Sequence, residues 1–363
     1  MKTLRLITTV ILLTAPTGFA ADAQNGWRSV VRATPYWESK GVAANLTTVR
    51  HWVLFSESYC ANPDRHLLLD YRWRFLGYID DGATAAETND RLNTTRQRLA
   101  EEGRIQDWHA GGQETLGYPF AISCDQPFVQ MHEAIARLTG DAEGSRIWGS
   151  WDGIDVGAEN AQVSLLQLFH EVVDHRREQG RFTFPDTTIP TFLGKVLIES
   201  SVIKEAESAT GALGIMQLSR QVLNDCRIPE RFYLHRIVQV DCALNLVEQN
   251  HRNLRPRFND RFGHLPTDKQ DRLYGLLLTQ TYLIGVGRSI ELLQDEELGA
   301  AARYFAANHD DFSAEDIMTG LIYHNLGRKD LGLLSLYYVI DAGLAQAALC
   351  AIGTMADDAW CSL

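Results

Sequence analysis

One carboxylic acid in this chain lies where it could work as a general acid. The run over 190–200 predicts a helix, with a proline in the first turn, where its missing N–H is not needed. Glu199 follows Val196 by three residues and precedes Ile203 by four, so the three share one helix face, with Phe192 one turn earlier. Burial disfavours the charged form of a carboxyl, which suits a general acid at neutral pH.

The stretch after this helix predicts a turn of small residues. It begins at Ser208 and contains two glycines, which let a backbone approach a ligand closely. It delivers Met216 and Gln217 just before a second helix, for which Ser219 is the predicted cap. An acid and a glycine-containing turn are therefore expected side by side.

Together these stretches resemble the opening motifs of the soluble-type (SLT) lytic transglycosylases, a lysozyme-like family that cleaves peptidoglycan. The family pattern is Glu-Ser, a loop carrying Ala and Ser, and then Gly-Ala-x-Gly-Leu-Met-Gln. This chain has Glu199-Ser200, Ala206, Ser208 and then Gly-Ala-Leu-Gly-Ile-Met-Gln over 211–217, without a gap. Three positions depart from the pattern: Val202, where an aromatic is usual, Lys204, where proline is usual, and Ile215, where leucine is usual.

A later segment also resembles the family. Residues 282–288 match its Tyr-Asn-Ala-Gly-x-Gly-Arg motif at Tyr282, both glycines and the arginine, but Leu283 replaces the asparagine. In the family that tyrosine and asparagine line the cleft beside the acid, so an amide contact is missing here. Residues 323–328 are a rival match that keeps an asparagine, Asn325.

Two helices complete the resemblance. Asp241 matches the family's Asp-x-x-x-Asn-Ile helix start and is expected to cap that helix. The stretch over 331–352 contains one charged residue, Asp341, and predicts a buried closing helix rather than a membrane span. In the family a tyrosine of the closing helix faces the catalytic carboxyl. Tyr338 is the candidate here, with Tyr337 as the alternative.

The resemblance implies a reaction with one acid. Protonated Glu199 would protonate the glycosidic oxygen between N-acetylmuramic acid and N-acetylglucosamine, and its carboxylate would then deprotonate the muramyl 6-hydroxyl to close a 1,6-anhydro ring. Peptidoglycan glycan strands are the implied partner, and neither a cofactor nor a metal is required. The implied substrate contacts are Ser208, Met216, Gln217, Tyr282 and Tyr338, of which Gln217 and the backbone near Met216 would hold the acetamido group.

The N-terminal sequence predicts export from the cytoplasm. Lys2 and Arg5, an apolar run and small residues up to Ala20 predict a signal peptide over 1–20, and thus a periplasmic or secreted protein. A formal net charge of -12 argues against nucleic acid as a partner; protein partners are not predicted.

Six cysteines in an exported chain predict disulfides, and sequential pairing is the simplest arrangement. A metal site is the weaker interpretation because Cys-x-x-Cys is missing. The cysteines are Cys60, Cys124, Cys226, Cys242, Cys350 and Cys361.

The predicted fold is mostly α. A lysozyme-like domain with a C-terminal helical extension over 181–363 follows a helical region of unrecognised family over 21–180. The helices predicted in that region cover 64–79, 85–102, 128–138 and 160–177. Its tryptophans either line a glycan-binding surface or belong to the core; they are Trp27, Trp52, Trp73, Trp108, Trp148 and Trp151.

Two other functions fit the same residues. A hydrolysing muramidase on this fold needs a second carboxylate near the cleft, and Glu205 and Glu207 are nearest in sequence. A non-catalytic glycan-binding protein would agree with Leu283 in place of asparagine. The products released from peptidoglycan distinguish the three hypotheses.

Overall fold

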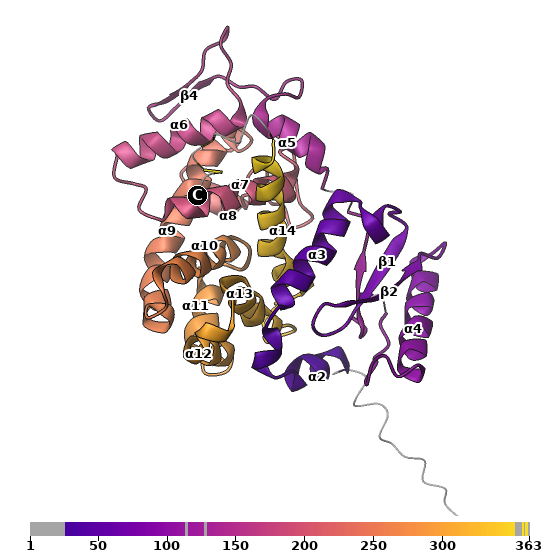
Figure 1. Cartoon of the computed structure of the whole chain (residues 1–363). Helices are drawn as coiled ribbons and strands as arrows, with labels where there is room; N and C mark the ends of the chain where they lie inside the picture. Colours follow the sequence, from indigo (N-terminus) through magenta and orange to yellow (C-terminus); the bar gives the residue numbers. More distant parts are fainter. Residues whose placement is uncertain (1–25, 113–114, 127–128, 353–357, 359, 362–363) are drawn as a thin grey trace, which may run out of the picture.

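A computed structural model describes residues 26–112, 115–126, 129–352, 358 and 360–361 (Figure 1). The predicted signal peptide lies outside them. The described chain is mostly helical, as predicted. The helices of its first half are α2 (Gly26–Ala33), α3 (Val42–Phe55), α4 (Ala85–Glu101), α5 (Met131–Thr139), α6 (Leu165–Glu178) and α7 (Ile189–Ser200). Those of the second half are α8 (Arg220–Asp225), α9 (Arg236–Phe262), α10 (Thr267–Ile284), α11 (Val286–Gln294), α12 (Ala300–Ala307), α13 (Ala314–Tyr323) and α14 (Leu333–Cys350).

The N-terminal region is part helix and part sheet. Strands β1 (Arg65–Leu69), β2 (Phe75–Asp80) and β3 (Phe120–Ser123) form an antiparallel sheet in the order β2-β1-β3. Strands β4 (Gly149–Trp151) and β5 (Ile154–Val156) form a separate hairpin. The prediction of an all-helical region is therefore wrong in this part.

The predicted helix over 64–79 is wrong because a turn interrupts it. The Asp70 carboxylate accepts hydrogen bonds from the backbone N–H groups of Arg72 and Arg74, both at 2.9 Å. Trp73 between them has a positive φ of 62°. An aspartate that binds the backbone two residues later favours a turn over a continuing helix. The chain therefore reverses, and β1 pairs with β2.

The other helices expected in this region are present with shifted ends. Helix α4 begins after Thr84, whose side chain accepts from Glu87 N–H, and α6 begins after Ser164, which caps Gln167 in the same way. Residue 128, the expected start of α5, lies outside the described residues. The start of α6 was predicted too early because Val163 instead forms a β-bridge with Ile147.

The helix that carries Glu199 packs directly against the closing helix. A Cβ added at Gly194 of α7 would overlap the backbone oxygen of Ala342 in α14. Only glycine allows this approach, because the two backbones touch where a side chain would otherwise separate them. Figure 1 shows α7 crossing α14 near the centre of the molecule.

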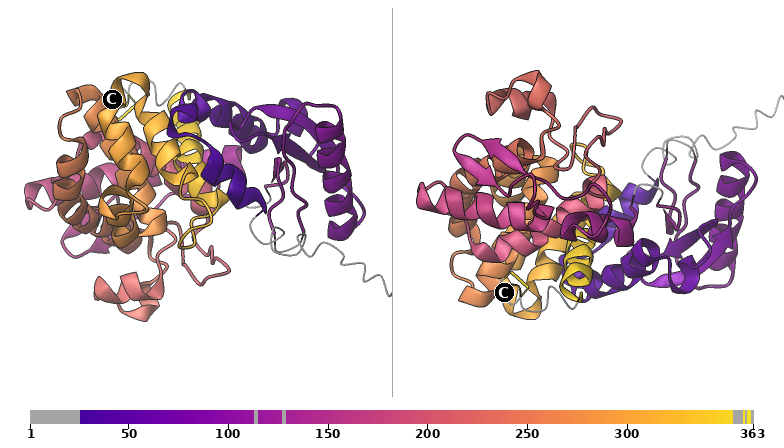
Figure 2. Two further views of the ribbon diagram at one scale, coloured as in Figure 1. Left: turned by 90° about the horizontal axis from the view of Figure 1, so that it is seen from below. Right: turned by 90° about the horizontal axis from the view of Figure 1, so that it is seen from above.

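The N-terminal region and the C-terminal helices share one hydrophobic core. Helix α3 packs against α14 and α13, as Figures 1 and 2 show. Trp73 is fully buried and meets the ring of Tyr337 edge-on, with 5.7 Å between centroids. Trp27 is buried as well, whereas Trp148 is 50% exposed. The N-terminal region therefore reaches the closing helix with its own core residues.

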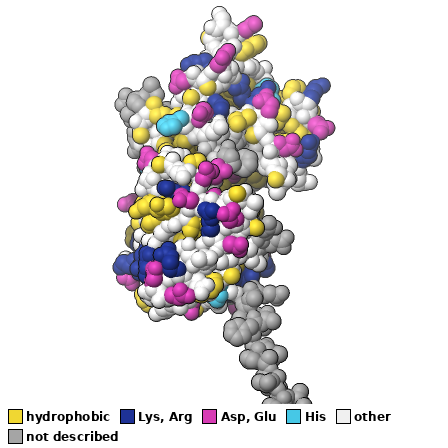
Figure 3. Space-filling model, turned by 90° about the vertical axis from the view of Figure 1, so that its right-hand side faces the viewer, with side chains coloured by type: hydrophobic (Ala, Val, Ile, Leu, Met, Phe, Trp, Pro, Cys, Tyr) yellow, Lys and Arg dark blue, Asp and Glu magenta, His cyan; other side chains and the backbone are white. Residues whose placement is uncertain are grey.

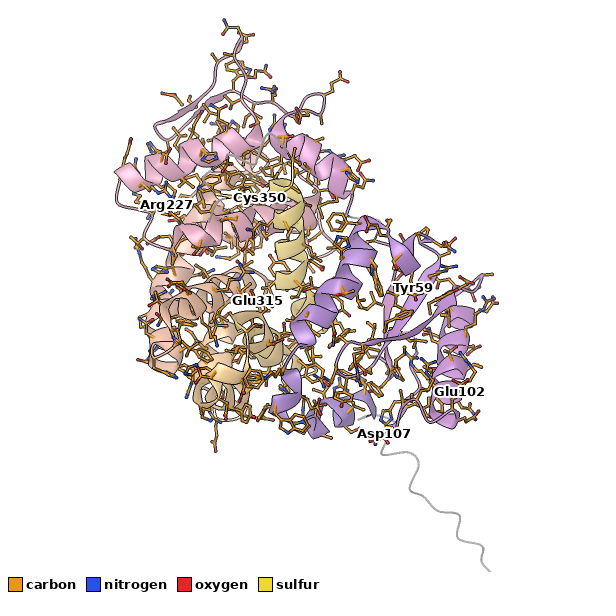
Figure 4. All side chains as sticks on the ribbon, viewed as in Figure 1. Tyr59, Glu102, Asp107, Arg227, Glu315 and Cys350 are labelled. Carbon is orange, nitrogen blue, oxygen red and sulfur yellow. A yellow bond between two sulfur atoms is a disulfide. The ribbon has the colours of Figure 1, made fainter. Side chains whose placement is uncertain are left out.

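Helix α14 is apolar and long enough to cross a membrane by length and composition, but core helices pass the same test. Half of it is buried in the protein, against α7, α3 and α10. Figure 4 shows side chains filling the space around it, with Cys350 at its end.

On the face in Figure 3, acidic and basic side chains are interspersed.

Three disulfides link the cysteines in sequential pairs, as predicted. They join Cys60 to Cys124, Cys226 to Cys242 and Cys350 to Cys361. Disulfides of this kind are typical of proteins from an oxidising compartment, outside the cell or in the periplasm.

Candidate active site

Glu199 lies in the last turn of α7, and its carboxylate meets a tyrosine from α14. The Tyr338 hydroxyl donates a hydrogen bond of 2.8 Å to Glu199 Oε1. Helix α7 ends here because Ser201 and Val202 have positive φ angles of 47° and 61°. The Ser200 hydroxyl holds the turn by donating to the Ile215 carbonyl at 2.8 Å. The structure thus brings the predicted acid and Tyr338 together.

Tyr337, the alternative candidate, lines the same cavity as Glu199 but makes no hydrogen bond to its carboxylate. The Arg50 guanidinium stacks over its ring at 4.7 Å from the centroid. Burial, and then the charge of Glu199, raise the pKa of Tyr338 well above its ordinary value. Tyr338 is therefore a neutral phenol that donates its hydrogen at physiological pH.

For the glycan cleavage that the resemblance implies, Tyr338→Phe should lower the turnover rate at least about tenfold, because a hydrogen bond to a charged group contributes about 1.5–3 kcal/mol. Phenylalanine fills the same volume, so thermal stability should change little. Tyr337→Phe is the matched control, since its hydroxyl forms no hydrogen bond with the described residues. Equal rates for both variants would show that Tyr338 does not assist the acid.

A buried lysine lies one helical turn before the acid. Lys195 is fully buried, and its Nζ donates a hydrogen bond of 2.7 Å to the Met216 carbonyl. Tyr282 donates to the same carbonyl at 2.9 Å, and Lys195 Nζ lies 3.6 Å from the centroid of its ring. Tyr282 thus contacts the loop after α7 through one backbone oxygen. Lys195 was missed, although a lysine four residues before Glu199 on an apolar helix was a visible signal.

Burial lowers the pKa of Lys195 to about 8, and the charge of Glu199 partly opposes the shift. Its ordinary value of 10.5 applies to the unfolded chain. Between these two values the unfolded state binds more protons, so stability rises with pH. This contribution to stability is fully present above pH 10.5 and is lost as the pH falls through about 8.

Lys195→Met should remove this pH dependence. The free energy of unfolding of the wild type should rise by about 3 kcal/mol between pH 8 and pH 10.5 relative to Lys195→Met. Urea denaturation of both proteins across this range measures the difference. A difference that stays constant with pH would mean that Lys195 is not buried as a cation.

Glu199 opens onto a cavity of about 390 Å³. Tyr338, Leu283 and Leu334 line it from the C-terminal helices, and Leu334 is 78% exposed. The opposite wall comes from the N-terminal region: Arg50 of α3, residues 121–123 of β3, Gln126 and Val129. This wall could not be predicted from the sequence, because its residues are far from the Glu199 motif along the chain.

A second carboxylate, Asp341, also lines this cavity. Arg50 binds both of its oxygens, through Nε and an Nη, at 2.7 Å each. Both side chains are mostly buried: that of Arg50 is 3% exposed and that of Asp341 is 12% exposed. Burial raises the pKa of Asp341, and Arg50 opposes this shift. Asp341 is therefore held as half of an ion pair.

Leu283 lies at the position where the resemblance expects asparagine. It is 40% exposed and lines both the Glu199 cavity and an adjoining cavity of about 570 Å³. The lining of the adjoining cavity is mostly apolar and includes three charged residues, Arg288, Lys329 and Asp330. The side chain at this position thus faces both cavities, but offers no hydrogen bond.

The predicted residues of the turn hold the turn itself. The Ser208 hydroxyl accepts from Ala212 N–H at 2.9 Å, and the Gln217 amide donates to the Gly214 carbonyl at 2.9 Å. The Met216 side chain is buried. These three residues are not among the described residues that line the Glu199 cavity.

Asp241 and Asn325 both have structural roles away from the Glu199 cavity. The helix at Asp241 begins earlier, at Arg236, so Asp241 lies inside α9 and does not cap it. It pairs instead with the buried Arg176 at 2.6 Å. The alternative match over 323–328 has a structural role. Its Asn325 is 1% exposed, and the side-chain amide donates to the Leu298 and Leu321 carbonyls, both at 2.9 Å.

No family model, curated protein or solved structure matches this chain. The resemblance around Glu199 therefore rests on the motif residues alone. The geometry adds two facts to it: a carboxylate with a tyrosine hydroxyl on one oxygen, and a second carboxylate with both oxygens on an arginine.

Proposed function

We propose that this protein is a peptidoglycan lytic transglycosylase in which Glu199 is the single acid and base. The arrangement of the two cavity carboxylates carries the proposal. Glu199 Oε1 accepts the Tyr338 hydrogen bond, while Oε2 accepts none from the described residues. Asp341 has both oxygens on Arg50. One carboxylate is thus free to exchange a proton with a ligand, and the other is not.

The reaction is the one that the resemblance to the family implies, and the free oxygen of Glu199 is compatible with it. Glu199 Oε2 gives a proton to the glycosidic oxygen as the bond from muramyl C1 to that oxygen breaks, and the acetamido oxygen stabilises the positive charge at C1. The muramyl 6-hydroxyl then attacks C1, and its proton returns to Oε2. The product carries a 1,6-anhydro ring, and no water is consumed. Tyr338 keeps Oε1 occupied, so proton transfer uses one oxygen throughout.

A hydrolysing muramidase is the second candidate. Hydrolysis by two carboxylates needs a second one as nucleophile or base, and Asp341 lies in the same cavity. Its pairing with Arg50 argues against that role. Glu205 and Glu207 are exposed, and Glu205 faces Lys204 at 3.7 Å. The solvated position of both argues against a catalytic role.

The products of wild-type digestion test the proposal. Purified peptidoglycan is digested, and the released muropeptides are identified by mass. Anhydromuramyl ends are the expected result. Reducing ends, heavier by one water, would favour the muramidase and make Asp341 the second carboxylate. Binding without release would favour a glycan-binding protein, with Leu283 as the missing contact. Anhydromuramyl ends would also agree with a periplasmic or secreted protein.

A further inference from the structure

Two further cavities adjoin the loop that follows Glu199. They measure about 380 and 220 Å³ and share Lys204 and Arg236 in their linings. Arg137 of α5 lines the first cavity, while Arg146 and His235 line the second. We call these five residues and the space they surround the basic pocket.

The guanidinium groups of the basic pocket are held by carbonyls rather than by carboxylates. Arg236 donates to the Ser145 carbonyl at 2.8 Å, and Arg137 donates to the Ser201 carbonyl at 2.8 Å. Arg146 donates to the Gly140 carbonyl at 3.1 Å. Carbonyls fix a guanidinium without neutralising it. No carboxylate of the described residues lies within salt-bridge distance of these three arginines.

The remaining groups leave the pocket positive. Lys204 has one loose pair, with Glu205 at 3.7 Å, and its side chain is 50% exposed. Glu143 and Glu205 are the acidic residues of the lining, against four cationic side chains. Burial, followed by Lys204 and Arg236, lowers the pKa of His235, so this ring is neutral. His235 Nδ1 is buried and has no hydrogen-bond partner among the described residues.

The pocket also offers apolar contact, and it lies close to the acid. Trp148 lines it and is 50% exposed, and Ile203 is 41% exposed. Lys204 follows Glu199 by five residues, so their Cα atoms are at most about 18 Å apart. The Glu199 cavity and the basic pocket share no lining residue, so we infer that a different part of the same ligand, a neighbouring sugar or its substituent, occupies the pocket.

We propose that the basic pocket binds a carboxylate of the substrate while the glycan chain lies at Glu199. This inference rests on the proposed function. The chain carries a formal net charge of -12 and so repels anionic polymers at long range. A local cationic site with fixed donors overcomes that repulsion at one place. Peptidoglycan carries carboxylates on its stem peptides, and on the lactyl groups where the peptides have been removed.

Equilibrium binding in the non-cleaving Glu199→Gln background tests the proposal. Three soluble probes of similar length are compared: peptide-bearing glycan strands, strands stripped of peptide by an amidase, and uncharged chitin oligosaccharides. Adding Lys204→Met should weaken binding of carboxylate-bearing strands at least about tenfold and leave chitin oligosaccharides unaffected. Lys204→Arg should retain binding. Lys40→Met is the matched control, because Lys40 is also exposed and loosely paired, 3.9 Å from Asp311.

Each outcome has a distinct meaning. A loss confined to peptide-bearing strands identifies a stem-peptide carboxylate, whereas a loss with stripped strands identifies the lactyl carboxylate; both support the proposal. Equal losses with Lys40→Met, or a loss that includes chitin oligosaccharides, would overturn it. If the protein binds all three probes equally well, the proposal for the basic pocket is wrong but the proposed function stands. If it binds none of the three probes, the proposed function itself is wrong.

Discussion

Glu199→Gln should lower the rate of anhydromuropeptide release by about 10²–10⁴-fold, the contribution typical of a positioned acid–base group. Glutamine matches glutamate in shape, and its amide oxygen can accept the Tyr338 hydrogen bond that is now 2.8 Å long. It cannot transfer a proton to the glycosidic oxygen. The variant should therefore fold normally and bind glycan strands, and fail in the chemical step.

Glu207→Gln is the matched control for this experiment. Glu207 is exposed on the loop after α7, eight residues from Glu199. It should retain the wild-type rate. Initial rates by muropeptide release, with strand binding measured in parallel, compare the two variants. Wild-type activity in Glu199→Gln would mean that the acid is another residue, and Asp341 would be the next to replace because it lines the same cavity.

Arg50→Ala should lower the free energy of unfolding by about 3–5 kcal/mol at pH 7, because it leaves the buried carboxylate of Asp341 without its partner. Burial already raises the pKa of Asp341, and Arg50 opposes that shift. Without Arg50 the pKa should rise further. An acid with a raised folded-state pKa loses stability as pH rises through that pKa. The deficit of the variant should therefore be largest at neutral pH and smaller in acid.

Denaturant unfolding at pH 7 and pH 5 measures both effects, and the double variant Arg50→Met with Asp341→Leu is the control. Removing both charges leaves neither one unpaired, so most of the stability should return. Asp341 lies one turn after Tyr338 on α14. Arg50→Ala should therefore also lower activity through the position of Tyr338. A deficit in the double variant as large as in Arg50→Ala would show that packing of the arginine, rather than its charge, stabilises this helix.

Local patterns in the sequence predicted the elements around Glu199 well. Helix α7, the turn after it and the closing helix with Tyr338 each follow from a short stretch whose spacing is visible by itself. The same holds for the sequential disulfides. Local patterns were misleading where a side chain acted on the backbone: the Asp70 carboxylate turns the chain where apolar spacing suggested a continuous helix.

The far wall of the site could not be predicted in this way. Arg50 and Asp341 are 291 residues apart, and each alone resembles an ordinary charged residue. Their pairing follows from the packing of α3 on α14, which no short stretch encodes. Asp241 shows the same limit, because its partner Arg176 lies 65 residues earlier, on α6.

The direct contact between α7 and α14 ties the separation of these helices to one residue, Gly194. At Gly194 and Ala342 backbone meets backbone, so no side chain stands between the helices to change its rotamer or its size. Adding a single methyl group at residue 194 would push the two helices apart. The hydrogen bond between Tyr338 and Glu199 would then lengthen or break. Any relative that keeps this crossing should therefore have a glycine at the position of Gly194.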